Sequence, residues 1–282
     1  MNTWTLRDRT LTPGRPALVM GIVNVTPDSF SDGGRFVDPA IAVAHGLELA
    51  RQGADILDIG GESSRPGAEP ITIEDELARV VPVIRGLAQA TTLPLSVDTT
   101  KAIVAEAALE AGAHIVNDIS ALGDPQMAAV LRRHRAGVVL MHMQGTPQTM
   151  QIQPHYADVV AEVVAFLQAR LRGAVELGIA ESAIVLDPGI GFGKSSQHNI
   201  RLLADLADLG KLGRPVLLGV SRKGFLGRLL DRPVEDRLAA SLAAACHALT
   251  LGSAQILRVH DVAQTRDAVR VIAALLLSAT EN

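Results

Sequence analysis

The feature that most limits the possible folds is a regular alternation of two kinds of segment along the chain. Short runs rich in β-branched residues are separated by longer stretches rich in Ala, Leu and Glu. This pattern is typical of parallel strands joined by crossover helices. Eight strands are expected, at Ala17–Val23, Asp55–Ile59, Pro94–Val97, His114–Val116, Val138–Met141, Ala183–Leu186, Pro215–Val220 and Gln255–Val259.

Eight helical stretches follow these strands, and several end at a glycine, the residue best suited to terminate a helix. A single (β/α)8 TIM barrel accounts for all sixteen elements. A doubly wound open sheet is the main alternative, but it does not require eight repeats and no G-x-G-x-x-G follows the first strand. The expected helices are Pro39–Gln52, Ile73–Ala90, Lys101–Ala111, Pro125–His134, Tyr156–Leu177, Asn199–Leu209, Val234–Leu251 and Val262–Ser278.

The length of 282 residues, 48% of them hydrophobic, fits one barrel domain. We assign residues 17–282 to the barrel and residues 1–16 to an N-terminal extension. The uncharged stretch Leu238–Leu257 has membrane-spanning length, but polar residues interrupt it and Gly252 divides it. It is therefore interpreted as a core helix followed by a core strand.

The net charge of -4 gives no reason to expect nucleic acid or a membrane as a partner. Cys246 is the only cysteine, which excludes an intrachain disulfide and a cysteine-based zinc site. The first sixteen residues do not resemble a signal peptide because they carry charges and lack an apolar stretch. A cytoplasmic enzyme is expected.

Polar residues gather where the expected strands end. In a barrel these ends form one mouth, where the βα loops converge and where barrel enzymes carry out their chemistry. Capping of the following helix could explain any one of these residues, but it does not predict a polar residue at so many strand ends. The residues are Asn24, Asp58, Asp98, Asn117, His142, Asp187, Ser221 with Lys223, and Arg258 with His260.

Two loops after the first two strands suit an anionic ligand. Asn24–Gly34 combines one carboxamide, two carboxylates, three hydroxyls and two glycines, and is expected to close over a ligand. Asp58–Gly67 joins glycines to Ser63, Ser64 and Arg65. The alternatives are a self-satisfied polar connection for the first loop, and for the second a surface turn in which Arg65 pairs with a nearby glutamate.

Three further strand ends supply groups that can recognise a flat heterocycle carrying several N–H groups. Asp98, Asn117 and Asp187 offer two carboxylates and an amide. The two carboxylates could instead hold a metal ion, but no helical His/Glu pattern accompanies them.

The last two strands end in cations. Lys223 enters the mouth at the start of a short helix, and it could bind an anion or, as an alternative, form a Schiff base. Arg258 and His260 point to the same side of their strand and suit a diphosphate. Many barrels bind phosphate after the seventh and eighth strands, in agreement with this grouping. His142 lies between two methionines and is assigned no catalytic role.

These motifs resemble a known family. Gly21–Gly34 and Asp58–Gly67 are similar to the two signature segments of dihydropteroate synthases, and the resemblance extends in order to the last helix. Five shorter motifs agree with it: Val97-Asp-Thr, Asn117-Asp-Ile, Asp187-Pro-Gly, Ser221-Arg-Lys and Arg258-Val-His-Asp.

The resemblance implies a (β/α)8 enzyme of folate synthesis that condenses 4-aminobenzoate with 6-hydroxymethyl-7,8-dihydropterin diphosphate, through a pterin cation and with release of pyrophosphate. It implies Mg²⁺ as cofactor, bound with the help of Asn24, and a homodimer. By the same resemblance Arg65, Arg258 and His260 surround the diphosphate, while Asp98, Asn117, Asp187 and Lys223 hold the pterin, with Asp98 stabilising the cation. The aminobenzoate is expected near Phe30, Ser64, Pro66 and Phe192.

The sequence departs from the family pattern in one place that concerns a substrate. Gly224 stands where many relatives carry Ser, so the aminobenzoate carboxylate is expected to meet backbone N–H groups alone. Two other functions remain open at this point: a methyltetrahydrofolate–corrinoid methyltransferase, which shares the pterin pocket but uses no diphosphate, and a pterin or anion binder without catalytic activity.

Overall fold

The computed structural model describes residues 3–14, 16–26 and 38–278. Its main element is an eight-stranded parallel sheet with the strand order β8-β7-β6-β5-β4-β3-β10-β9. The strands are β3 (Leu18–Asn24), β4 (Ile56–Gly60), β5 (Leu95–Asp98), β6 (Ile115–Asp118), β7 (Gly137–Met141), β8 (Ile184–Asp187), β9 (Leu217–Leu218) and β10 (Ile256–Val259).

The two edges of this sheet meet. Leu186 pairs with Val216 in a parallel bridge, and the Leu186 N–H donates to the Pro215 carbonyl over 3.0 Å. The sheet therefore closes into the predicted barrel, and the open doubly wound alternative is wrong. All eight expected strands are present, although β9 covers only Leu217–Leu218 of the expected 215–220. Val216, directly before it, forms only the isolated bridge to Leu186.

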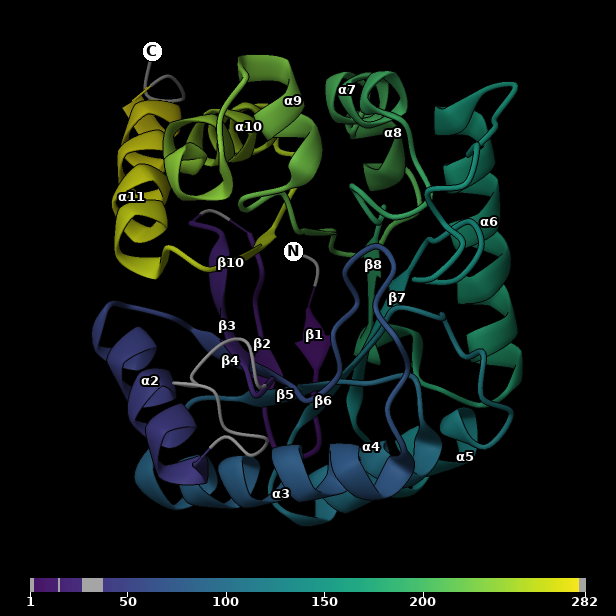
Figure 1. Ribbon diagram of the computed structural model, residues 1–282, viewed down its shortest axis with the longest axis vertical. Helices are drawn as coiled ribbons and strands as arrows, with labels where there is room; N and C mark the ends of the chain where they lie inside the picture. The colour runs from purple at the N-terminus through teal and green to yellow at the C-terminus, as the bar shows by residue number, and fades with distance from the viewer. Residues whose placement is uncertain (1–2, 15, 27–37, 279–282) are drawn as a thin grey trace.

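Helices surround the barrel, as Figure 1 shows. The larger of two apolar cores lies between the strands and the helices, and it includes Leu57, Val97, Val116 and Leu186. The helices are α2 (Pro39–Arg51), α3 (Ile73–Ala90), α4 (Ala102–Glu110), α5 (Met127–His134), α6 (Val159–Glu176), α7 (Ser196–Ala204), α8 (Ala207–Gly210), α9 (Gly224–Leu230), α10 (Leu238–Thr250) and α11 (Val262–Ser278), with short 3-10 turns η1 (Glu181–Ala183) and η2 (Val234–Asp236).

Three of the expected helices differ from the prediction by three residues or more. The helix expected over 234–251 begins only at Leu238, because residues 234–236 form the 3-10 turn η2. The stretch expected as one helix over 199–209 is two helices, α7 and α8, and α7 begins earlier because Ser195 and His198 form a reciprocal capping box. Helix α6 begins at Val159 because the Asp158 side chain accepts hydrogen bonds from the N–H groups of Val160 and Ala161. The 238–257 stretch is α10 followed by β10, as predicted.

A short hairpin closes the base of the barrel. Strands β1 (Trp4–Thr5) and β2 (Thr10–Leu11) pair antiparallel, and Trp4 and Leu6 are buried. A Cβ on Gly137, at the start of β7, would lie 2.4 Å from Leu6, so this glycine makes room for the hairpin. Seven of the eight barrel strands contribute one residue each to the small core around Trp4: Met20, Ile56, Ile115, Val139, Val185, Leu217 and Ile256.

The hairpin belongs to residues 1–16, which the sequence predicts to be an N-terminal extension. Its described part is integrated with the barrel, because the Trp4 indole N–H donates to the Ala183 carbonyl over 2.9 Å. Among the described residues, no helix combines the length and the apolar content needed to cross a bilayer.

Candidate active site

The carboxyl ends of neighbouring strands are level with one another. Asn24 pairs with Gly60, Gly60 with Asp98, and Asp98 with Asn117. On the other side of the barrel Asp187 pairs with Met141 at the end of β7. Because these pairs lie at one end of a closed barrel, the strand-end residues share one rim, as the sequence predicts.

Arg258 lies at the centre of an ion-pair network in this mouth. Its Nε donates to Asp58 Oδ2 over 2.6 Å and its Nη2 donates to Asp98 Oδ2 over 2.7 Å. Asn117 Nδ2 donates to the same Asp58 oxygen over 3.2 Å. Asp58 is fully buried, and its Oδ1 has no hydrogen-bond partner in the described structure. Arg258 is thus held between two carboxylates from β4 and β5.

Asp187 and Lys223 lie in the other half of the barrel mouth, and their opposite charges attract each other. Asp187 Oδ1 accepts a hydrogen bond from the Gly189 N–H over 2.6 Å. The Lys223 ammonium lies 4.0 Å from the centre of the Phe192 ring, a cation–π contact. Phe192 therefore stands beside the lysine that the sequence places in the mouth.

His260 continues the rim beyond β10. Its Nδ1 lies 3.0 Å from Ser221 Oγ, and its own N–H donates to the same hydroxyl over 3.2 Å. The next residue, Asp261, forms an ion pair with Arg222. These contacts tie the loop after β9 to the end of β10, so that Lys223 and His260 are held in neighbouring segments.

Burial shifts the pKa values of this group. Burial raises the pKa of Asp98 to about 7 against the attraction of Arg258, and it also raises the pKa of Asp187. Burial lowers the pKa of Lys223 to about 8, and burial together with Arg258 lowers the pKa of His260 to about 4. Burial disfavours the charged form of Arg258, but Asp58 and Asp98 outweigh it and raise its pKa. Strongly shifted groups in one mouth are typical of an active site.

The loop after β4 forms the wall of a cavity of about 420 Å³. Ser64 and Asp98 line this cavity, together with residues of the 141–148 segment and of α6. Arg65 and Pro66 are exposed at the outer edge of the loop. Glu62 does not pair with Arg65, because Lys101 binds both Glu62 and the buried Glu76. Arg65 forms no ion pair within the described residues, so its guanidinium remains available to a ligand.

Not every predicted site residue can be placed. Phe30 and the rest of the first loop from residue 27 lie outside the described residues. Asn24, the last residue of β3, is half-buried at the rim, next to Gly60. Its carboxamide oxygen is a hard donor of the kind that Mg²⁺ accepts.

The sequence does not predict the roles of three residues that support the site. Asp58 and Ser221 stand out there only as polar strand ends, and their partners, Arg258 and His260, become visible only in the fold. Lys194 closes the glycine-rich motif after β8, and its ammonium is buried against His142. The signal for Lys194 is the glycine-rich motif itself, which brings the backbone close to a neighbouring group.

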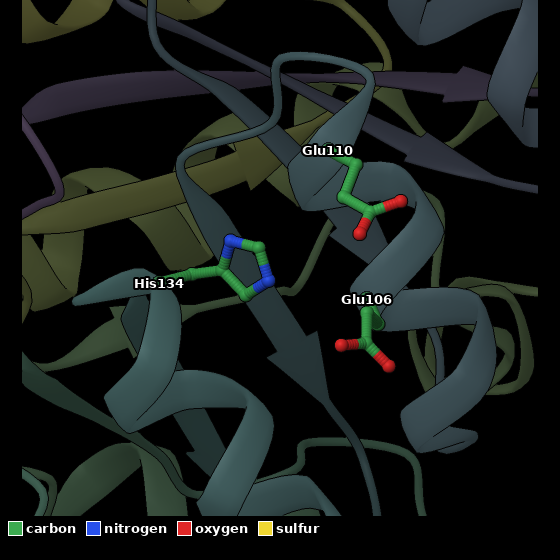
Figure 2. A group of neighbouring side chains, drawn as sticks. All are labelled: Glu106, Glu110 and His134. Carbon is green, nitrogen blue, oxygen red and sulfur yellow. The ribbon is translucent and has the colours of Figure 1, made fainter.

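A second group of possible metal ligands lies away from the mouth. Figure 2 shows Glu106 and Glu110 on α4 facing His134 on α5, and their ligand atoms lie within 4.8 Å of one another. Barrel helices run antiparallel to the strands, so the ends of α4 and α5 that carry this group lie towards the base. Arg133 already pairs with Glu106. This surface group is therefore separate from the candidate site.

Comparison with known proteins agrees with the family resemblance predicted from the sequence. Residues 20–260 match the family model described as pterin binding enzyme. The dihydropteroate synthase of Escherichia coli strain K12 is 47% identical over 264 residues, which cover 94% of this chain and 93% of that protein.

Two solved structures share the whole architecture. One is a Xanthomonas albilineans dihydropteroate synthase with 4-aminobenzoic acid, with a TM-score of 0.91, 51% identity and coverage of 98% of both chains. The other is a Yersinia pestis dihydropteroate synthase with a sulfonamide drug complex, with a TM-score of 0.91, 45% identity and coverage of 97% of this chain and 98% of that one.

Proposed function

The chain belongs to the pterin binding enzyme family, and we propose that it catalyses the dihydropteroate synthase reaction. In this reaction 4-aminobenzoate condenses with (7,8-dihydropterin-6-yl)methyl diphosphate, giving 7,8-dihydropteroate and pyrophosphate. The observation that carries the proposal is the mouth itself, where carboxylates, an amide and cations from separate strands converge around Arg258.

The pterin fits the carboxylate side of the mouth. Asp98, Asn117 and Asp187 supply acceptors and one amide for its N–H and carbonyl groups, and Lys223 supplies a donor. Carboxylate Asp98 is also the group that would stabilise positive charge as the C–O bond breaks. Because Asp98 is already held by Arg258, little reorganisation is needed when that charge develops.

The diphosphate fits the cationic side. Arg258 Nη1 makes no hydrogen bond within the described residues, so it can donate to a phosphate oxygen. Arg65 is a second candidate cation for the leaving group. His260, whose pKa is lowered to about 4, is neutral near pH 7 and is a candidate hydrogen-bond donor through a ring N–H. Asn24 would hold Mg²⁺ as a single protein ligand, with phosphate and water oxygens completing its coordination. When bound, the metal would neutralise charge on the departing pyrophosphate.

The aminobenzoate is proposed to bind between the second loop and Phe192. Ser64 and Pro66 lie on that loop, and the Phe192 ring offers an apolar face beside Lys223. Phe30 is proposed to complete this pocket. Sulfonamides imitate aminobenzoate, so they are expected to compete for the same space.

The reaction can be tested by measuring pyrophosphate release from the pterin diphosphate. Release is expected to require Mg²⁺, to depend on 4-aminobenzoate over repeated turnovers, and to be inhibited by a sulfonamide competitively with 4-aminobenzoate. A corrinoid methyltransferase would release no pyrophosphate, and a binding protein would bind the pterin without turnover. Either outcome would exclude the proposed reaction.

We also propose that the protein works in the cytoplasm as a homodimer. Helix α11 supports the second part, because Val271, Leu275 and Leu277 are 58%, 60% and 63% exposed on it. Such an apolar surface is typical of an interface between subunits. Sedimentation equilibrium should give about twice the chain mass of 29.7 kDa, whereas a mass of one chain at micromolar concentration would contradict the proposal.

A further inference from the structure

Lys194 is a fully buried lysine beside the candidate site that the proposed reaction does not use. Its ammonium donates to the carbonyls of Gly189 and Phe192 over 2.9 Å each, and it lies 2.9 Å from His142 Nδ1. No carboxylate lies within ion-pair distance of it in the described structure. Burial lowers the pKa of Lys194 to about 7. A buried ammonium of this kind costs free energy unless its hydrogen bonds are satisfied, and here they are.

The backbone folds around this ammonium because of its glycines. Gly189, Gly191 and Gly193 have φ angles of 65°, 86° and 59°, a region that other residues rarely adopt. A Cβ on Gly189 would lie 1.9 Å from the His142 carbonyl oxygen, and one on Gly193 would lie 2.4 Å from the Gln144 carbonyl oxygen. The loop therefore packs directly against the segment that follows β7.

The other side of this loop faces the candidate site. The Gly189 N–H holds Asp187, and the Phe192 ring lies against Lys223. A Cβ on Gly191 would lie 3.0 Å from Cδ of Lys223. The loop thus fixes the positions of Asp187, Phe192 and Lys223. Its Gly189 and Phe192 carbonyls accept hydrogen bonds from Lys194.

His142 anchors the ammonium from the opposite side. The His142 N–H donates to the Asp187 carbonyl over 3.0 Å, and its ring meets Phe166 edge to face at 4.9 Å. Burial lowers the pKa of His142 to about 3, so the imidazole is neutral and Nδ1 can accept from Lys194. In this arrangement His142 acts as a hydrogen-bond partner of Lys194.

From this geometry we infer that Lys194, held by His142, is a positioning residue that sets the place of Asp187, Phe192 and Lys223 and so controls binding of both substrates. The inference rests on the proposed function. Lys194 touches neither substrate; it acts through the loop. A lysine that only stabilised the barrel would affect the folded fraction and leave substrate binding unchanged.

Lys194→Met tests the inference against a matched control, Arg214→Met. Arg214 is also a buried cation that donates to backbone carbonyls, those of Ile184, Ser182 and Thr3, but at the base of the barrel. We expect Lys194→Met to raise KM for the pterin diphosphate and for 4-aminobenzoate by roughly 10-fold or more, with a smaller fall in kcat. Arg214→Met should lower the melting temperature and leave both KM values near those of the wild type.

Two further variants keep the test decisive. Lys194→Gln retains hydrogen-bond donors for the two carbonyls, so its KM values for both substrates should lie closer to those of the wild type. If Lys194→Met does not fold, Lys194→Gln still allows the KM values to be measured. Phe192→Ala should make the aminobenzoate KM insensitive to a second change at Lys194, because both act through the same ring.

Two results would overturn the inference: unchanged KM values in folded Lys194→Met, or additive effects of the two changes. Wild-type turnover in the same assay tests the proposed function separately. If the wild type releases no pyrophosphate, the proposed function fails, whatever the variants do.

Discussion

Replacing Arg258 by alanine should reduce pyrophosphate release by about 100- to 1000-fold, the loss typical for removal of a preorganised charged donor. The same change leaves Asp58 and Asp98 next to each other without their cation. Breaking a buried ion pair in this way costs about 3 kcal/mol or more in the free energy of unfolding. Steady-state assays and thermal unfolding of the same preparation measure the two effects.

Two controls separate catalysis from stability. Arg266 also pairs with a carboxylate, Asp55, and donates to the Gly53 carbonyl at the base of the barrel. Arg266→Ala should therefore lower stability but leave the rate of the folded enzyme intact. Gln153→Ala, at an exposed position outside every motif, should change neither activity nor stability. Equal activity in the Arg258 and Gln153 variants would contradict the assignment of Arg258 to the site.

Asp98→Asn should lower kcat by about 100- to 1000-fold while changing KM less. The substitution removes the negative charge that stabilises the developing cation, but it keeps the shape of the side chain. The pH dependence should change with it. Since the pKa of Asp98 is raised to about 7, the carboxylate forms only as pH rises through neutrality, and kcat/KM of the wild type should rise there.

At higher pH the wild-type profile should fall again as Lys223, with a pKa of about 8, loses its proton. A carboxamide does not titrate in this range, so the Asp98→Asn variant should lack the rising limb and keep the falling one. The ratio of the two rates at each pH cancels the ionisation of the diphosphate substrate itself. A ratio that stays constant from about pH 6 to pH 8 would show that Asp98 is not the titrating group.

The strands were predictable because they are short runs rich in β-branched residues, separated by longer stretches rich in Ala, Leu and Glu. The eight predicted runs lie within one or two residues of the observed strands, apart from β9. Helix boundaries were less predictable where the capping group was unusual. Ser195 starts α7 with His198 in the position where a capping box usually has Glu or Gln.

The partners of the site residues were not predictable, because they depend on contacts across the barrel. Arg258 binds Asp58, 200 residues away in the chain, and Lys194 meets His142 over 52 residues. Strand ends indicate which residues share the mouth, but they do not indicate which side chain binds which. The hairpin was missed for a similar reason: strands of two residues carry no periodicity, and Trp4 finds its partners only in the closed barrel.

The hairpin at the base of the barrel packs against strands that come much later in the sequence. The carbonyl that accepts the Trp4 indole hydrogen bond belongs to Ala183, which is synthesised 179 residues after Trp4. The small core around it also needs Ile256, from the last strand. The core around Trp4 is therefore complete only after β10 has been synthesised and has joined the barrel. Burial of Trp4 thus reports completion of the barrel, and the chain's single indole is a natural fluorescent marker of that late event.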